Sequence, residues 1–251
     1  MRPPDLEVLL PVHNEAASIE GTLVEIYQTV SAVASMRFLL CEDGSTDGTP
    51  DVLRRLTGVL PIRLLTDPQR KGYARAVIDG LRNAEAPFVL CMDADGQVDP
   101  VAIVRAWPLR DEFDVVVGWR VRRADAFPRR VMSRVYRMLH AITLQVPLRD
   151  PSCPFILVGR RALSSILDEL GVLREGLWWE FTARVWHGGF GVAEVAVQHR
   201  PRAAGLTQVY RWHKIPGIAW SHLAGLWVLR RQLAHKRRGS VRVRLGSAPR
   251  V

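Results

Sequence analysis

The chain has 251 residues, 48% of them hydrophobic, which suits one large α/β domain with a substantial core. It contains no run of the ~18 uninterrupted apolar residues that a membrane-spanning helix needs, so an integral membrane protein is not expected. The formal net charge is +10, and every charged residue after Glu194 is basic, which indicates an anionic partner: a membrane surface or nucleic acid.

Apolar runs that alternate with helical patterns predict the elements of the first half. The expected strands are Glu7–Val12, Arg37–Cys41, Ile62–Leu65, Phe88–Met92 and Val115–Val117. Helices are expected from Ile19 to Val30, after Pro50 with Thr49 as N-cap, and from Ala74 to Leu81. This alternation predicts a mostly parallel sheet with helices on both faces.

Polar side chains follow three of these strands. Asn14 and Glu15 follow the first, Asp43 follows the second, and the Asp93–Gln97 loop follows the fourth. Because ligands of open parallel sheets bind at the carboxyl ends of the strands, we expect these loops to converge on one binding edge.

The sequence Asp93-Ala94-Asp95-Gly96-Gln97 combines two carboxylates and a carboxamide at the end of a buried strand. If the strand geometry continued, the two carboxylates would project to one side. Such an oxygen-only set suits Mg²⁺ or Mn²⁺ carried on a diphosphate better than zinc. Taken alone, the same letters also fit a solvated turn.

Two common nucleotide-binding signatures are missing from the sequence. It has no Gly-x-Gly-x-x-Gly and no Walker-type loop, so a dinucleotide dehydrogenase or a P-loop kinase is not expected. The pattern favours a nucleotide held by acids, with its diphosphate bridged by a metal. A nucleotidyltransferase of related fold ranks low, because the first strand is followed by His13-Asn14-Glu15 and not by a glycine-rich loop.

Four segments together carry a family resemblance. They are Leu10-Pro11-Val12-His13-Asn14-Glu15, Glu42-Asp43-Gly44-Ser45-Thr46-Asp47-Gly48-Thr49, Arg70-Lys71-Gly72 and Asp93-Ala94-Asp95-Gly96-Gln97. In this order they resemble the family 2 glycosyltransferases of the GT-A fold, most of all the dolichol-phosphate mannosyltransferase and polyprenyl-phosphate glycosyltransferase branch. The resemblance covers residues 7 to about 210. It implies metal-dependent, inverting transfer of a sugar from a GDP- or UDP-sugar.

The resemblance also implies roles for individual residues. Those implied to bind the nucleotide sugar are Pro11, Val12, Asn14, Glu15, Asp43, Lys71, Asp93, Ala94, Asp95 and Arg202. The implied ligands of Mg²⁺ or Mn²⁺ are Asp93, Asp95 and Gln97. The candidates for catalysis are Asp95, Arg120, Asp150 and Glu180.

The second half contains candidates for the acceptor side. The segment from Arg120 to Arg137 contains seven arginines and only one acidic residue. Guanidinium groups suit the phosphate of a lipid-phosphate acceptor. By the resemblance, Arg120 and either Arg130 or Arg134 fill this role; a solvated helix face explains the cluster equally simply. Around Asp150, the segment Asp150-Pro151-Ser152-Cys153-Pro154-Phe155 departs from the family's Asp-x-Thr-Gly-Ser-Phe, which leaves acceptor specificity open.

Two later segments complete the candidates, and the first of them has competing interpretations. Glu180 falls where related enzymes place an acid near the acceptor, but a buried glutamate beside two tryptophans is an equal alternative. Arg202 and Thr207 resemble the family's Arg-x-x-Gly-x-Ser loop, which can fold over the donor phosphates.

The chain divides into three expected segments, two of them at the C-terminal end. Residues 1–210 form the GT-A domain, 211–238 an amphipathic helical segment, and 239–251 a disordered basic tail. The apolar, tryptophan-containing run 215–229 between arginines suits an interfacial helix on a membrane, or a helix packed on the domain itself.

Three interpretations of function remain open. The first is transfer to a polyprenyl phosphate by a peripheral protein on the cytoplasmic face of a membrane. It agrees with the missing signal peptide and with Cys41, Cys91 and Cys153, which lack metal-type spacing and suit a reducing compartment. The second is transfer to a hydroxyl of a saccharide, glycolipid, protein or small molecule. The third, a nucleic-acid-binding module, is disfavoured because the tail after Arg230 has no aromatic residue to stack on bases. The oligomeric state is left open.

Overall fold

The computed structural model describes residues 4–121, 127–173, 175–200 and 215–234; for 127–133 and 215–220 it describes the backbone alone. A seven-stranded sheet lies at the centre, in the order β3-β2-β1-β4-β6-β5-β7. Its strands are β1 (Leu6–Val12), β2 (Met36–Asp43), β3 (Ile62–Asp67), β4 (Phe88–Cys91), β5 (Val115–Arg120), β6 (Ile156–Gly159) and β7 (Val192–Val197). All neighbours are parallel except β6, which runs antiparallel to both β4 and β5.

The order of the strands defines where ligands can enter. The chain moves outward from β1 to β2 and β3, then returns to place β4 on the other side of β1. The strand order thus reverses between β1 and β4, and in an open α/β sheet ligands usually bind between the loops that follow two such strands. Since β5 is parallel to β4, its carboxyl end reaches the same edge.

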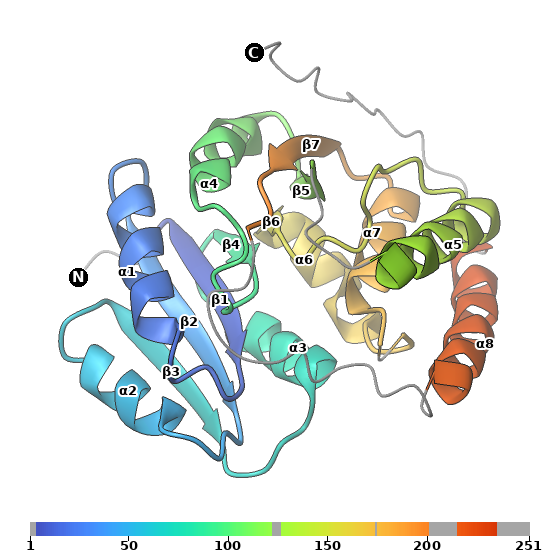
Figure 1. The fold of residues 1–251 in the computed structure, drawn as a ribbon. Coiled ribbons are helices and arrows are strands. Elements are labelled where there is room, and N and C mark those ends of the chain that lie inside the picture. The colour runs from blue at the N-terminus through green and yellow to red at the C-terminus, as the bar shows by residue number, and fades with distance from the viewer. Residues whose placement is uncertain (1–3, 122–126, 174, 201–214, 235–251) are drawn as a thin grey trace.

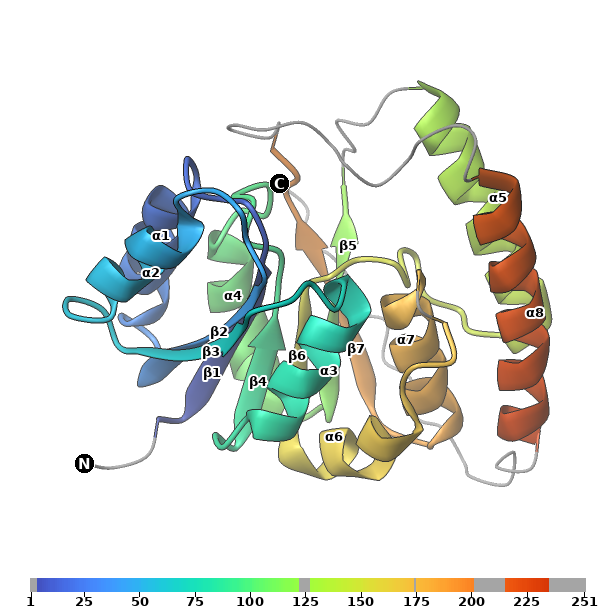
Figure 2. The ribbon, with the colours of Figure 1, turned by 90° about the horizontal axis from the view of Figure 1, so that it is seen from below.

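Helices cover both faces of the sheet (Figures 1 and 2). One face is covered by α1 (Ile19–Val30), α2 (Thr49–Leu56) and α4 (Val101–Ala106), which continues into the short 3-10 helix Trp107–Asp111. The other is covered by α3 (Tyr73–Asn83), α6 (Arg160–Ile166), α7 (Leu177–His187) and α8 (Ile215–Ala234), with the 3-10 helix Leu167–Glu169 after α6. The long helix α5 (Phe127–Leu144) lies beside α8 at the end of the molecule far from α2.

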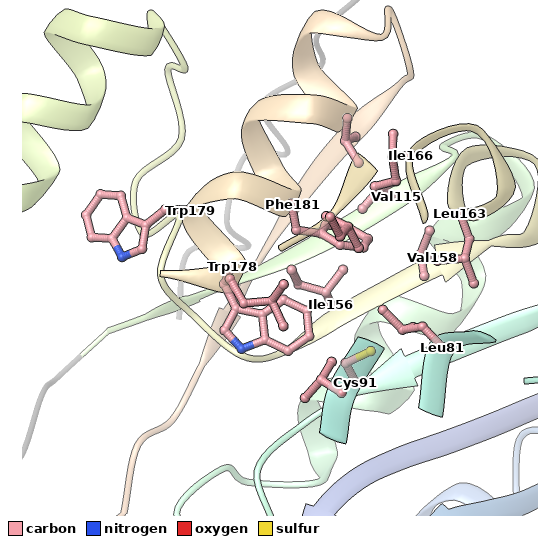
Figure 3. Packing of buried hydrophobic residues seen from close by; sticks show 14 of the residues in the cluster. Leu81, Cys91, Val115, Ile156, Val158, Leu163, Ile166, Trp178, Trp179 and Phe181 are labelled. Atoms are coloured by element: carbon pink, nitrogen blue, oxygen red, sulfur yellow. The ribbon is translucent and has the colours of Figure 1, made fainter. Parts of the chain in front are cut away.

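The strands join the two apolar layers because successive side chains point to opposite faces. In β1, Leu9 packs with α3 and its neighbours, whereas Val8 and Leu10 pack with α1. Figure 3 shows the layer under α7, where Phe181 and Trp178 gather over β5 and β6. Both faces of β1, β2, β4 and β6 are buried, as the continuous apolar runs predict, whereas the edge strand β3 is only partly buried.

The predicted mostly parallel sheet with helices on both faces is confirmed, with two local differences. Thr49 is inside α2 and not its N-cap; Gly48 holds that position. Strand β4 ends at Cys91, one residue before the predicted end, and Asp93 and Asp95 lie in the loop that follows.

The C-terminal predictions are answered in part. Helix α8 buries Leu226, Leu229 and Leu233 in the core layer of the domain. The division into 1–210, 211–238 and 239–251 stays a prediction, because 201–214 and 235–251 are outside the described residues. None of the described helices combines the length and apolar character that crossing a membrane would require.

Candidate active site

The loops after β1 and β2 are locked together by short hydrogen bonds. Asn14 adopts a left-handed conformation (φ 56°), its backbone N–H donates to Ser45 Oγ at 3.0 Å, and its Oδ1 accepts the Thr46 N–H at 2.8 Å. The Glu15 N–H donates to Thr49 Oγ1 at 2.9 Å, which explains why Thr49 does not cap α2. Asn14 is therefore used, at least in part, to shape this edge of the sheet.

Asp43 fixes the next loop. Its buried carboxylate accepts the backbone N–H groups of Lys71 at 2.6 Å and Gly72 at 2.9 Å. Gly44 (φ 61°) allows the approach, because a Cβ there would stand 2.6 Å from the Arg70 nitrogen. The predicted nucleotide-binding residues Asp43 and Lys71 are thus brought together, with the carboxylate of Asp43 holding the loop that carries Lys71.

The side chain of Lys71 lies among acids. Its Nζ pairs with Asp67 and, at 3.2 Å, with Asp79. The hydrogen bond that Lys71 donates to Asp67 is the main cause that raises the pKa of Lys71, so the ammonium is charged at this edge of the sheet. A diphosphate would have to share or replace these carboxylate partners.

Asp93 is held by a relay from two other elements. Its Oδ1 accepts a 2.7 Å hydrogen bond from the Tyr73 hydroxyl at the start of α3, and that hydroxyl accepts the Trp178 indole N–H at 2.8 Å. Burial of the hydroxyl, together with the charge of Asp93, raises the pKa of Tyr73 well above its usual value. Tyr73 therefore stays a hydrogen donor to Asp93 throughout the neutral range.

The rest of this loop is held by the segment after β7. Asp95 Oδ1 accepts the Gln97 N–H at 3.1 Å, and Gly96 takes a positive φ of 71° between them. The Gln97 carbonyl accepts the Arg200 N–H at 2.7 Å, and Gln97 Nε2 donates to the Arg200 carbonyl at 3.2 Å. This bond orients the amide of Gln97, whose oxygen is the atom with ligand chemistry.

The oxygen ligands of the Asp93–Gln97 loop suit a divalent cation whose other ligands are substrate phosphates. Among the described residues, no three His, Cys, Asp or Glu side chains come together in a way that could hold a metal. The loop offers two half-buried carboxylates, Asp93 and Asp95, and the amide oxygen of Gln97. Mg²⁺ and Mn²⁺ are bound in this manner when one or two carboxylates act together with substrate phosphates.

Arg120 and Asp150 form a two-bond ion pair at the end of β5. Arg120 Nε donates to Asp150 Oδ2 at 2.7 Å and Nη2 to Oδ1 at 3.0 Å, while Nη2 also donates to Ser152 Oγ at 2.8 Å. Their side chains are 13% and 10% exposed. Although burial works in the opposite direction, hydrogen bonding and charge from Asp150 raise the pKa of Arg120, and the charge of Asp93 adds to this. The ion pair thus fixes the guanidinium of Arg120 at the carboxyl edge of the sheet.

The loop before β6 lies directly against β5 because of a glycine. A Cβ on Gly118 would stand 2.7 Å from Val197, 2.9 Å from Phe155 and 3.1 Å from Cys153. This contact places the loop that carries Asp150 beside Arg120. Burial raises the pKa of Cys153 to about 12, so its thiol stays protonated.

Glu180 is a buried, fully hydrogen-bonded residue of α7 and not an accessible acid at the carboxyl edge. It is fully buried in α7, where Oε1 accepts from Arg184 at 2.8 Å and Oε2 accepts the N–H groups of Leu173 at 2.8 Å and Gly171 at 3.2 Å. Arg184 also binds Glu169. The suggested catalytic role of Glu180 is therefore corrected to a structural one, since its side chain is 0% exposed and is bound entirely to donors inside the fold.

The remaining predicted residues divide into placed and undescribed ones. Val12 and Ala94 are buried, and Pro11 is half-buried, near the ends of β1 and β4. Arg134 is exposed on α5. The side chains of Arg130 and Arg202, and residue Thr207, lie outside the described part, so their roles stay predictions.

The sequence interpretation missed Tyr73 and Trp178. Tyr73 follows the Arg70-Lys71-Gly72 step directly, which places it at the first turn of a helix that begins at the binding edge. That position was a usable signal. Trp178 offered none, because its bond to Tyr73 spans 105 residues.

Comparison with known proteins defines the class. Residues 7–167 match the model of the glycosyl transferase family 2, and the chain belongs to this family. It is 29% identical to glycosyltransferase AglD of Haloferax volcanii over 90% of this chain. It is 28% identical to dodecaprenyl-phosphate galacturonate synthase of Rhizobium johnstonii over 81% of the chain. It is 26% identical to dolichyl-phosphate hexose transferase of Haloferax volcanii over 79% of the chain.

The chain spans 37% of the length of the first relative, 61% of the second and 84% of the third. Among solved structures, it is similar to the mannosyltransferase PcManGT of Pyrobaculum calidifontis in complex with GDP-Man and Mn²⁺. The TM-score is 0.62 at 20% identity, over 96% of this chain and 66% of that one. This similarity supports the GT-A fold.

Proposed function

We propose that the chain transfers a sugar, with inversion, from a GDP- or UDP-sugar to a polyprenyl phosphate. The observation that carries the proposal is the carboxyl edge of the sheet, where the Asp93–Gln97 loop follows β4 and the bidentate Arg120–Asp150 pair stands at the end of β5. One supplies the chemistry for a metal-bound diphosphate, and the other supplies a fixed cation for an anionic acceptor. Two relatives named for prenyl phosphates support this choice of acceptor.

On the donor side, the residues position a diphosphate. A bound Mg²⁺ or Mn²⁺ would supply neutralisation of the leaving nucleoside diphosphate. Asp93, Asp95 and Gln97 would hold it, and the bond from Tyr73 keeps Asp93 oriented. The interlocked loops at Asn14 and Asp43 form the wall for the nucleoside.

On the acceptor side, Arg120 binds the phosphate. Its guanidinium is held by Asp150 and Ser152, so little side-chain entropy is lost when an anion arrives. A phosphate oxygen then attacks the anomeric carbon from the face opposite the diphosphate, which departs with the bonding electrons. Because this nucleophile is already anionic at neutral pH, positioning and charge stabilisation suffice without a strong base.

A hydroxyl acceptor is the second candidate, and one observation favours it. A hydroxyl needs a base, and Asp150 is a carboxylate at the acceptor side of the edge. For either acceptor we propose a peripheral protein on the cytoplasmic face of a membrane, which agrees with the buried free thiols of all three cysteines.

A donor screen tests the proposal. The chain is incubated with each nucleotide sugar, Mg²⁺ or Mn²⁺ and a short polyprenyl phosphate, and release of nucleoside diphosphate is measured. We expect one donor to be consumed only when polyprenyl phosphate is present. Release that depends on an added saccharide and never on polyprenyl phosphate would replace the acceptor by a hydroxyl.

Asp95→Ala provides the matched test of the loop. We expect transfer to fall at least a thousandfold, about 4 kcal/mol of transition-state stabilisation. Asp111→Ala, at an exposed aspartate away from the carboxyl edge, is the control and should keep full activity. Near-normal transfer by Asp95→Ala would refute the metal assignment.

A further inference from the structure

Helices α5 and α8 carry an unusual share of exposed apolar side chains. Among the described side chains, every exposed Leu, Ile, Met and Trp lies on these two helices; elsewhere the large exposed hydrophobics are valines and Tyr73. The exposed apolar residues of the pair are Val135, Met138, Ile142, Leu223, Trp227 and Val228. We name this set the α5–α8 surface.

On each helix one side packs on the domain and the other side is exposed, so the exposed apolar residues form a defined face. Helix α8 turns Leu226, Leu229 and Leu233 into the core layer, whereas Trp227 is 55% exposed. Helix α5 buries His140 and Leu144 and leaves Ile142 67% exposed. Figures 1 and 2 both show the two helices side by side at one end of the molecule.

The charge on this face has one sign. Neither α5 nor α8 contains an aspartate or glutamate. Exposed arginines stand beside the apolar side chains: Arg134 and Arg137 on α5, Arg230 and Arg231 on α8. The guanidinium of Arg231 lies 3.8 Å from the centre of the Trp227 ring. Tryptophan and arginine side by side are typical of groups that sit at the depth of lipid headgroups.

We propose that the α5–α8 surface lies on a bilayer that contains anionic phospholipids, with its apolar side chains among the acyl chains and its arginines at the headgroups. The inference rests on the proposed peripheral location and deepens it, because it names the two helices that contact the bilayer and the kind of lipid they bind. It also gives α5 a role that the sequence interpretation assigned to α8 alone. Helix α5 follows β5, whose end carries Arg120, so the bilayer contact and the acceptor residue belong to consecutive elements.

Two other occupants fit this face less well. A second copy would bring arginines against arginines in a symmetric contact, with no acid on either helix to pair with them. Nucleic acid is matched by the arginines but not by the exposed side chains of Met138, Ile142 and Leu223, since aliphatic side chains neither stack on bases nor contact phosphates. A bilayer matches both the apolar and the cationic parts.

Vesicle sedimentation tests the apolar part without donor or acceptor. Vesicles of phosphatidylcholine with about a third phosphatidylglycerol should bind the full chain, and pure phosphatidylcholine much less. The double variant Ile142→Ser/Trp227→Ser should lower binding at least tenfold, because two large apolar groups no longer leave water. The control is Val59→Ser/Val101→Ser, at valines that are 74% and 50% exposed elsewhere. It should bind like the unaltered chain.

Neutralised arginine pairs test the cationic part. Arg230→Gln/Arg231→Gln should lower binding to the anionic vesicles about 25-fold, roughly fivefold for each charge. The matched control is Arg54→Gln/Arg55→Gln, an adjacent pair on α2 at the other end of the molecule. All variants keep residues 235–251, so any loss comes from the surface and not from the basic tail. Circular dichroism confirms that each variant is folded.

The result that overturns the proposal is equally specific. Unchanged binding by both helix variants, or no preference for anionic vesicles, would exclude this surface as the bilayer contact. So would a dimer by light scattering that Ile142→Ser/Trp227→Ser dissociates while vesicle binding is absent, or binding to duplex DNA alone. Sugar transfer to a short polyprenyl phosphate in detergent needs no bilayer, so failure here is separable from failure of the proposed function.

Discussion

Asp150 and Glu180 were both candidates for an acid at the acceptor side, and each is paired with an arginine. The Asp150–Arg120 pair lies at the carboxyl edge of the sheet, and both side chains keep about a tenth of their surface accessible. The Glu180–Arg184 pair lies inside the layer of α7, with side chains 0% and 2% exposed. Both oxygens of Glu180 are engaged by donors of the fold. The same chemical pair is thus a functional candidate in one place and a core element in the other.

The largest effect should come from the interior pair. Glu180→Gln leaves Arg184 without one of its carboxylates in a buried setting, and we expect the unfolding free energy to fall by about 3 kcal/mol. The turnover number of the folded variant should change little, because Glu180 does not contact the edge. Urea unfolding and initial rates measure the two quantities. The control Glu20→Gln removes an exposed glutamate that pairs with Arg55 and should cost no measurable stability.

For the Asp150–Arg120 pair we expect the opposite result, a loss of activity with little loss of stability. Asp150→Asn keeps the shape of the side chain and removes the charge that holds Arg120, so we expect kcat/KM to fall about 100-fold, or about 2.7 kcal/mol. For a polyprenyl phosphate, most of the loss should be in the KM of the acceptor; for a hydroxyl acceptor, in kcat. The control is Asp114→Asn, at an arginine-paired aspartate before β5, at the opposite edge of the sheet. Equal losses for both variants would contradict the assignment.

The sequence predicts a site residue well when its position follows directly from a strand or helix, and poorly when its role depends on partners from other parts of the fold. Apolar periodicity predicts the strands and helices, and strand order then predicts which loops meet. This suffices for Asn14, Asp43 and the Asp93–Gln97 loop, because each follows a strand directly. It does not suffice for Glu180, because its neutralisation depends on Arg184 one turn away and on backbone N–H groups of a loop nine and seven residues earlier. No pattern of residue types indicates those distances.

A buried histidine near the Glu180–Arg184 layer should make stability depend on pH. His140 Nε2 of α5 donates to the Trp179 carbonyl at 3.0 Å, and its Nδ1 is buried without a hydrogen-bond partner. Burial, with a contribution from His222, lowers the pKa of His140 to about 4. Since the unfolded chain takes up this proton near pH 6.5 and the folded chain near pH 4, stability is full above the first value and is lost as the pH falls toward the second.

The expected loss between pH 7.5 and pH 5 is about 2 kcal/mol, measured by urea unfolding. His140→Gln has no titrating ring, so its stability should change less over the same interval. An equal change in both proteins would assign the acid sensitivity to other groups, such as His222, whose pKa burial also lowers.

Asp93 offers a third arrangement, a carboxylate held by a neutral donor. Tyr73→Phe keeps the ring and removes the 2.7 Å hydrogen bond, so Asp93 loses a bond that orients its carboxylate. We expect kcat/KM to fall about tenfold, close to 1.4 kcal/mol, with weaker apparent affinity for Mn²⁺ as the main cause. A purely structural role would lower the unfolding temperature and leave the metal dependence unchanged. Tyr27→Phe, which removes a hydroxyl on α1 away from this relay, is the control and should alter neither. Because Trp178 donates to the same hydroxyl, Trp178→Phe should reproduce part of the metal effect; its failure to do so would confine the relay to Tyr73 and Asp93.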